Sequence, residues 1–363
     1  MKGYLTNFQI AVFIFNAMFG YGIMILPQQL AESANTAGWL VILVFTFLSM
    51  IITYMITYLN YTFKGSTLDE YSKILVGKFL SFIIIVFYIL YLFLYSTVII
   101  RKTSELVKYS LLVKTPIWIL CLTLLFVCYF AVNRGINTIG RFSELYGIYI
   151  IITISLLYII FFTQGDIKNI KPFLGYENLS HYLKSSYPVM TSFLGMELIG
   201  IIPFNNKNDK NIFKYSVIAT LLTGLLYIFL FESSMSLVGP ERIIFYEDAL
   251  IAAARRTEVP YLEFLRRIDG IVIIVWLMSV ITTVTILSYA LVFYLGKIFK
   301  KANINTLTIL CFVSTFLACH LPKNTRQAHS LADIAGYVGI ISSIFITTIL
   351  FIALKVKKYA QKN

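Results

Sequence analysis

Charged residues are scarce in this chain of 363 residues, and their scarcity decides its class. Asp, Glu, Lys and Arg together make up 13% of the sequence, whereas hydrophobic residues make up 59%. The mean hydropathy is +0.82. Apolar runs of about 20 residues, the length that crosses a bilayer as a helix, recur along the whole chain. The composition excludes a water-soluble globular protein and predicts a polytopic protein embedded in a lipid bilayer.

Cysteine and histidine are few as well. The four cysteines lie in apolar runs without a Cys-x-x-Cys pair, and the three histidines are scattered, so we expect neither a metal site nor a disulfide framework. The sequence also lacks the Gly-x-x-x-x-Gly-Lys-Ser/Thr, Gly-x-Ser-x-Gly and His-Glu-x-x-His motifs. We therefore expect no enzyme, no catalytic residue and no cofactor.

The basic residues point to lipid rather than to nucleic acid. The net charge is +13, but Lys and Arg are dispersed among loops and helix ends, where membrane proteins place them against lipid headgroups. No nucleic-acid partner is expected. Basic residues near the C-terminus, together with Lys297, Lys300 and Lys301, favour both termini on the cytoplasmic side of a cell membrane.

The apolar runs, with Gly and Pro between them, predict ten membrane-spanning helices in a single domain, 1–363. We expect them at 8–33, 38–63, 79–110, 116–133, 143–163, 184–204, 213–237, 260–296, 304–321 and 331–355. Residues 241–256, between the seventh and eighth spans, predict a short amphipathic helix on the membrane surface. Five spans (about 8–163) precede the connection at 164–184 and five (about 184–355) follow it.

Two spans contain an interruption. Phe19-Gly20-Tyr21-Gly22 lies in the first span and Leu194-Gly195-Met196-Glu197 in the sixth. Non-helical backbone survives inside a bilayer only where protein or a cavity covers it. Paired breaks at corresponding places in two halves indicate a binding site at the midplane. We therefore predict an all-α fold with a five-plus-five inverted repeat and broken helices 1 and 6.

The segment Gly20-Tyr21-Gly22 has two other interpretations: close helix packing through small residues, and a channel filter. If both helices are broken, Ile23 and Leu198 restart them. Free N–H groups there would favour a ligand carboxylate, and the preceding carbonyls would favour an ammonium. An amino acid fits both, and another small polar molecule is also compatible.

Glu197 either faces a ligand or joins helices as a structural group. In the third span, tyrosines on successive turns either pack or close over a ligand. In the eighth span, hydroxyl side chains share a face, although Ser and Thr often bond the carbonyl four residues earlier. The candidate ligand-binding residues are Gly20, Tyr21, Gly22, Ile23, Tyr91, Tyr95, Gly195, Met196, Glu197, Leu198, Ser279, Thr282 and Thr283.

Several short stretches, taken in order, resemble one known family. They include Thr67-Leu68-Asp69-Glu70-Tyr71, the stretch from Gly135 to Glu144, and the stretch from Tyr187 to Pro203. The sequence resembles the permease-like B subunit of endospore germinant receptors, within the amino acid–polyamine–organocation transporter superfamily.

The resemblance implies a LeuT-like fold of ten helices and a ligand pocket between the broken helices and spans three and eight. It also implies assembly with an A and a C subunit in the spore inner membrane. The expected function is to sense a small nutrient, an amino acid. The alternative is a stand-alone proton-coupled amino-acid permease, followed by an ion channel or a water-conducting pore.

Overall fold

The computed structural model describes residues 4–173, 179–205, 208–257 and 268–357, and in these ranges the chain is helical without a β-strand. Six described segments are long and apolar enough to cross a membrane, and the first of them, Asn7–Thr62, holds both α1 and α2. Two shorter apolar helices, α5 and α12, and the interrupted pair of α7 and η3 complete the ten spans.

The spanning elements are α1 (Asn7–Ala34), α2 (Gly38–Thr62), α4 (Lys78–Ser110), α5 (Ile117–Asn133), α6 (Ile136–Gln164), α7 (Leu179–Ser192) with η3 (Met196–Ile201), α8 (Asn211–Val238), α11 (Ile268–Ile298), α12 (Ile304–Cys319), and α13 (Thr325–Ile340) continued by the π-helical turn η5 (Ile341–Phe345) and α14 (Ile346–Val356). The prediction of ten spans is confirmed. Residues 260–267, where the eighth span was expected to begin, lie outside the described residues.

Within the described ranges, five short elements connect the spans: η1 (Asn35–Ala37), α3 (Leu68–Val76), η2 (Ile167–Ile170), α9 (Pro240–Ile243) and α10 (Ala249–Arg255). The helix α3 was not predicted. It begins with a capping box, in which Thr67 and Glu70 satisfy each other's backbone N–H groups, so its start is fixed by local sequence.

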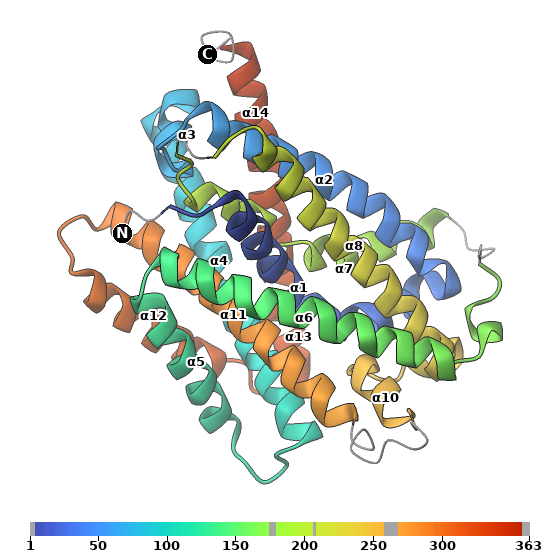
Figure 1. Cartoon of the computed structure of the whole chain (residues 1–363). Coiled ribbons are helices and arrows are strands. Elements are labelled where there is room, and N and C mark those ends of the chain that lie inside the picture. Colours follow the sequence, from blue (N-terminus) through green and yellow to red (C-terminus); the bar gives the residue numbers. More distant parts are fainter. Residues whose placement is uncertain (1–3, 174–178, 206–207, 258–267, 358–363) are drawn as a thin grey trace.

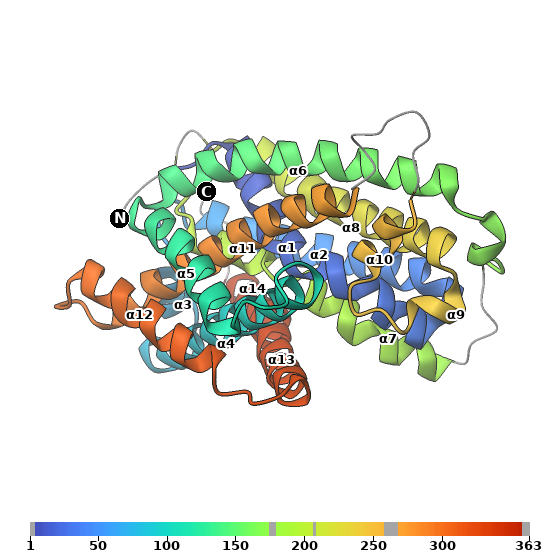
Figure 2. The same ribbon diagram turned by 90° about the horizontal axis from the view of Figure 1, so that it is seen from below.

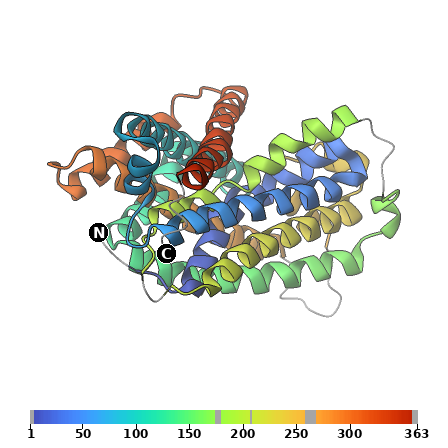
Figure 3. The same cartoon turned by 90° about the horizontal axis from the view of Figure 1, so that it is seen from above.

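The helix α1 runs through the middle of the bundle. It packs against α6, α7, α8 and α11, and every residue from Ile10 to Gly20 is buried. Figure 1 shows α6 crossing it. Figure 3 shows α2 (blue), α8 (olive) and α6 (green) running side by side along one face. Figure 2 shows α3 at one end of the bundle and α9 and α10 at the other, which we call the α10 end.

The predicted break in the first span is wrong, because α1 is one continuous helix from Asn7 to Ala34. A side chain at position 20 would lie 2.8 Å from Cβ of Thr283, and one at position 22 would lie 2.6 Å from the hydroxyl of Tyr227. The two glycines therefore let α11 and α8 approach α1 closely, which is the packing role of small residues in membrane helices. The segment is unbroken, and it faces protein.

The predicted surface helix at 241–256 is also different in the structure. It is divided into α9 and α10, and residues 249–254 are all buried. The helix α10 packs against α1, α8 and α11, because its run of Ala, Leu and Ile is apolar on every side. It covers the α10 end of the bundle instead of lying on the membrane surface.

Candidate ligand-binding site

The break in the sixth span is confirmed, and one glycine makes it possible. The helix α7 ends at Ser192, and η3 begins at Met196 after a turn. In that turn Gly195 has φ +121°, a conformation that other residues adopt only with strain. A Cβ at this position would lie 2.6 Å from the backbone carbonyl carbon of Ala17. Glycine is therefore needed both for the turn and for the contact with α1.

Glu197 closes the break from inside. Its side chain is fully buried, and the backbone N–H of Gly195 lies 3.1 and 3.0 Å from its two carboxylate oxygens. The hydroxyl of Tyr91, on α4, donates a hydrogen bond to one of these oxygens at 2.7 Å. The carboxylate thus satisfies an N–H group that the interrupted helix leaves without a helical acceptor. The structure gives Glu197 a structural task, and its contact with a ligand stays a prediction.

Three further side chains bind carbonyls at the break. The hydroxyl of Tyr227, on α8, lies 2.9 Å from the carbonyl of Met18 and 3.1 Å from that of Ser192, so its hydrogen joins α1 to α7. The amide of Asn60, on α2, donates to the carbonyls of Ile199 and Ile202 at 2.7 and 3.2 Å.

The third side chain that binds a carbonyl at the break is Tyr95 of α4, whose hydroxyl donates to the carbonyl of Thr191 at 3.1 Å. Sequence reasoning missed Tyr227 and Asn60. An amide inside an apolar span was a usable signal for Asn60. Tyr227 is one of 25 tyrosines, and nothing in its local sequence distinguishes it.

The predicted tyrosines of α4 come together with α1. The rings of Tyr91 and Tyr95 stack with their centroids 5.5 Å apart, and the ring of Tyr21 meets that of Tyr95 edge-on at 6.1 Å. Met196 lies at the start of η3, where its sulfur accepts a hydrogen bond from Thr53 at 3.7 Å. Because the hydroxyls of Tyr91 and Tyr95 also bond Glu197 and the carbonyl of Thr191, this aromatic cluster adjoins the break.

The hydroxyl residues of α11 have separate roles. Thr283 donates to the carbonyl of Asn16 on α1, close to Gly20. Thr282 bonds carbonyls of its own helix, at Met278 and Ser279, which agrees with the structural interpretation. The hydroxyl of Ser279 is buried and has no partner among the described residues. Ile23 and Leu198 are buried apolar side chains of the core.

Open space lies next to the break, towards the α10 end. A cavity of about 450 Å³ is lined by Tyr21 and Ile25 of α1, by residues of α4 from Lys102 to Ser110, and by the connection between α9 and α10. A second cavity of about 40 Å³ also touches Tyr21 and Ile25 and reaches Ser192 at the end of α7. We call these the outer cavity and the inner cavity. Glu197, Tyr91 and Ser279 line neither of them.

The structure is closed around Glu197, because the polar groups of the break bond each other. The space beside Gly20 and Gly22 is also occupied, by the side chains of Thr283 and Tyr227. This arrangement suits the binding of a small polar molecule after local opening. The described residues contain no group of three or more His, Cys, Asp or Glu side chains placed to hold a metal ion.

The chain is similar to known proteins in sequence and in fold. A sequence model described as spore germination protein matches residues 4–328. Spore germination protein YndE of Bacillus subtilis (strain 168) is 26% identical, over 99% of this chain and 98% of that protein. Spore germination protein A2 of the same organism is 28% identical, over 98% of this chain and 96% of that protein.

Among solved structures, MhsT in complex with L-phenylalanine aligns with a TM-score of 0.71, covering 98% of this chain and 99% of that chain at 14% identity. This likeness shows the fold, which is LeuT-like. The matched family and the apolar helices make the chain an integral membrane protein.

Proposed function

Because the chain belongs to the spore germination protein family, we propose that it is the nutrient-sensing, permease-like subunit of a spore germinant receptor. It binds a small ligand, an amino acid, near the bilayer midplane, where α1 meets the break between α7 and η3. The observation that supports this proposal is the break itself, with a fully buried carboxylate held to the backbone inside a membrane span. Such a feature is costly in lipid and marks ligand sites in related architectures.

The closed break suggests how a ligand acts. The carboxylate of Glu197 and the N–H of Gly195 now satisfy each other. A ligand ammonium would compete for the carboxylate, and a ligand carboxylate would compete for N–H groups of the break. A ligand changes a conformational equilibrium only through its different affinities for the two states. Exchange of the internal hydrogen bonds for ligand contacts is the proposed trigger.

The remaining residues of the proposed site belong to three other elements. Gly20, Tyr21, Gly22 and Ile23 belong to α1, Tyr91 and Tyr95 to α4, and Ser279, Thr282 and Thr283 to α11. The proposed partners are the A and C subunits of the receptor, and the proposed location is the spore inner membrane with both termini in the cytoplasm. The basic residues near the C-terminus support that orientation.

The test is a thermal-shift screen of the purified chain with the proteinogenic amino acids. We expect one or a few of them to raise the melting temperature, because a ligand that binds only the folded state stabilises it by mass action. Glu197→Gln removes the charge that would bind an ammonium. We expect it to weaken the apparent affinity about tenfold or more, since a hydrogen bond to a charged group contributes about 1.5–3 kcal/mol.

Glu232→Gln is the matched control. Glu232 is also a carboxylate within a span, on α8, and one of its oxygens has no partner among the described residues. The Glu232→Gln chain should keep the ligand response of the wild type. A Glu197→Gln chain with an unchanged dose response would show that Glu197 serves the break alone.

The alternative is a stand-alone proton-coupled amino-acid permease. The structural likeness to MhsT, a protein solved in complex with L-phenylalanine, favours it as the second candidate. Both candidates predict amino-acid binding, and they differ in whether the lone chain moves its ligand across a membrane.

A further inference from the structure

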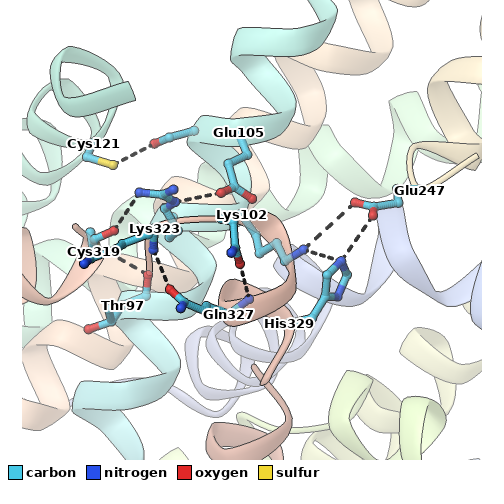
Figure 4. A network of polar contacts seen from close by, with 12 residues as sticks. Thr97, Lys102, Glu105, Cys121, Glu247, Cys319, Lys323, Gln327 and His329 are labelled. Atoms are coloured by element: carbon cyan, nitrogen blue, oxygen red, sulfur yellow. Dashed lines mark hydrogen bonds and ion pairs between the residues drawn. The ribbon is translucent and has the colours of Figure 1, made fainter. Parts of the chain in front are cut away.

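A histidine at the α10 end has two competing partners. Lys102 of α4, Glu247 of the connection between α9 and α10, and His329 of α13 meet there, as Figure 4 shows. Nε2 of His329 lies 2.8 Å from Nζ of Lys102 and 3.1 Å from Oε1 of Glu247. The side chain of Lys102 is 8% exposed, whereas those of His329 and Glu247 are 44% and 60% exposed. Solvent protons therefore reach the imidazole.

One ring nitrogen cannot serve both partners at once. The ammonium of Lys102 only donates hydrogen bonds, so it needs a lone pair on Nε2. The carboxylate of Glu247 only accepts, so it needs a proton on Nε2. Protonated His329 would also place two cations next to each other, which repel. Protonation therefore exchanges Lys102 for Glu247 as the partner of α13.

These residues stand where the two cavities meet. Lys102 and Glu247 line the outer cavity, and His329 lines the inner cavity. The inner cavity lies between Tyr95 and Val98 of α4 and residues 332, 333 and 336 of α13. A hydrogen bond from Lys102 to His329 joins these same two helices. It therefore ties the two helices together beside the inner cavity.

We propose that His329 is a proton-binding site that controls passage from the outer to the inner cavity. Neutral His329 accepts a hydrogen bond from Lys102 and keeps α4 and α13 together. Protonated His329 donates to Glu247 and leaves Lys102 with its ion pair to Glu247, at 4.0 Å, as its remaining contact in the triad, which opens the rim of the inner cavity beside Tyr21. The ligand at this site is the proton itself, bound at Nε2.

The surrounding charges leave this exchange possible. The titratable and charged groups that face the site are Arg101 and Glu105 of α4, Glu247 and Asp248 before α10, Tyr187 of α7, and Asp333 of α13. Arg101 and Glu105 pair with each other at 2.7 Å. The hydrogen bond from His329, together with the charge of Lys102, holds the pKa of Glu247 below its ordinary value. Glu247 is therefore an anion throughout the range in which histidine ordinarily titrates.

The test measures access to the inner cavity without any ligand. A cysteine at position 191 reports on the inner cavity, and one at position 110 reports on the outer cavity. Each variant, Thr191→Cys and Ser110→Cys, is made in the purified full chain and in the same chain carrying His329→Gln. N-ethylmaleimide, an uncharged thiol reagent, is applied at about pH 5.5 and about pH 7.5, on either side of the ordinary titration range of histidine. The parent chain, whose four native cysteines are all buried, gives the background.

Thiol ionisation also changes with pH, so each rate is divided by the rate of the same cysteine in the His329→Gln chain. For Thr191→Cys we expect this ratio to rise about tenfold or more at the lower pH, a factor that corresponds to about 1.4 kcal/mol. The ratio for Ser110→Cys should not change. A ratio for Thr191→Cys that is independent of pH, or that falls at low pH, would overturn the proposal.

Two more variants complete the test. Lys102→Gln removes the α4 partner, so Thr191→Cys should react quickly at both pH values. Slow labelling of this chain at both pH values would also overturn the proposal. His320→Gln, at an exposed histidine beside the end of α12, should keep the pH dependence.

The inference depends on the proposed function only in regarding the inner cavity as the way to the ligand. Because labelling needs no amino acid, a failed labelling test leaves ligand binding standing, and a failed ligand screen leaves the proton site standing.

Discussion

At the residue scale, the break in the sixth span depends on side chains that replace lost helical hydrogen bonds. Glu197 accepts from the N–H of Gly195, Tyr227 bridges two carbonyls, and Asn60 donates to two more. Unpaired backbone groups cost several kcal/mol each in a bilayer core. These contacts are therefore a condition for an interrupted helix at this depth.

The bridge made by Tyr227 is open to a direct test. Tyr227→Phe keeps the ring, which packs against Phe19 and Phe193, and removes only the hydroxyl. The carbonyls of Met18 and Ser192 then lose their shared donor, and we expect a loss of stability of about 1–3 kcal/mol. Thermal unfolding of the purified variant measures it. Tyr158→Phe is the control, since the hydroxyl of Tyr158 is buried without a partner among the described residues, and its removal should be neutral or stabilising. Equal effects of the two substitutions would contradict the bridging role.

At the element scale, the sequence predicted the spans well and the breaks only in part. Long apolar runs bounded by Gly and Pro are sufficient to predict the spans, because the bilayer fixes their length. Glycine pairs are ambiguous, because they permit either a break or a close helix contact. Whether a break or a close contact forms at Gly20 and Gly22 depends on Thr283 and Tyr227. These two residues are distant in the sequence but lie against the glycines in the fold. Single-sequence reasoning has no access to that information.

A single added methyl group at Gly195 should destabilise the protein, because the break in the sixth span leaves no room for it. Gly195→Ala places a Cβ against the backbone of Ala17 and forces alanine into a conformation with φ +121°. We expect a loss of stability of about 1–3 kcal/mol from the backbone strain alone. In Gly270→Ala, on α11, the new methyl group meets open space, and we expect a gain of about 0.5–1 kcal/mol from helix propensity. Thermal unfolding of both variants checks the contrast, and a well-tolerated Gly195→Ala would contradict the described turn.

At the scale of the whole molecule, the candidate site was predicted from local sequence and completed by long-range pairs. Tyr91 and Glu197 were both predicted, but their hydrogen bond joins residues 106 positions apart. The triad of Lys102, Glu247 and His329 joins three elements in the same way, and no local pattern marks it. Polar partners of this kind are set by the packing of helices, which a single sequence does not specify.

Packing of the whole chain also frames the choice between receptor and permease. The polar groups of the break bond each other, and the outer and inner cavities lie on the side of the break towards the α10 end. A permease must also open a way towards the α3 end, whereas a receptor subunit needs only to change shape when its ligand binds and to pass that change to its partners. The structure in this closed form is compatible with a sensor that responds without completing a transport cycle.

Transport and assembly, measured on the same protein, distinguish a receptor subunit from a stand-alone permease. The wild-type chain is reconstituted alone in lipid vesicles with an imposed proton gradient, and the labelled amino acid from the thermal-shift screen is added. We expect binding without accumulation above that of empty vesicles. In spores, Glu197→Gln should still assemble with the A and C subunits, as measured by co-purification, but should require at least about tenfold more nutrient for germination, in proportion to the lost charge-assisted contact. Glu232→Gln should behave as wild type in both measurements. Proton-driven accumulation by the lone wild-type chain, together with germination that is independent of the A and C subunits, would contradict the receptor proposal and establish the permease.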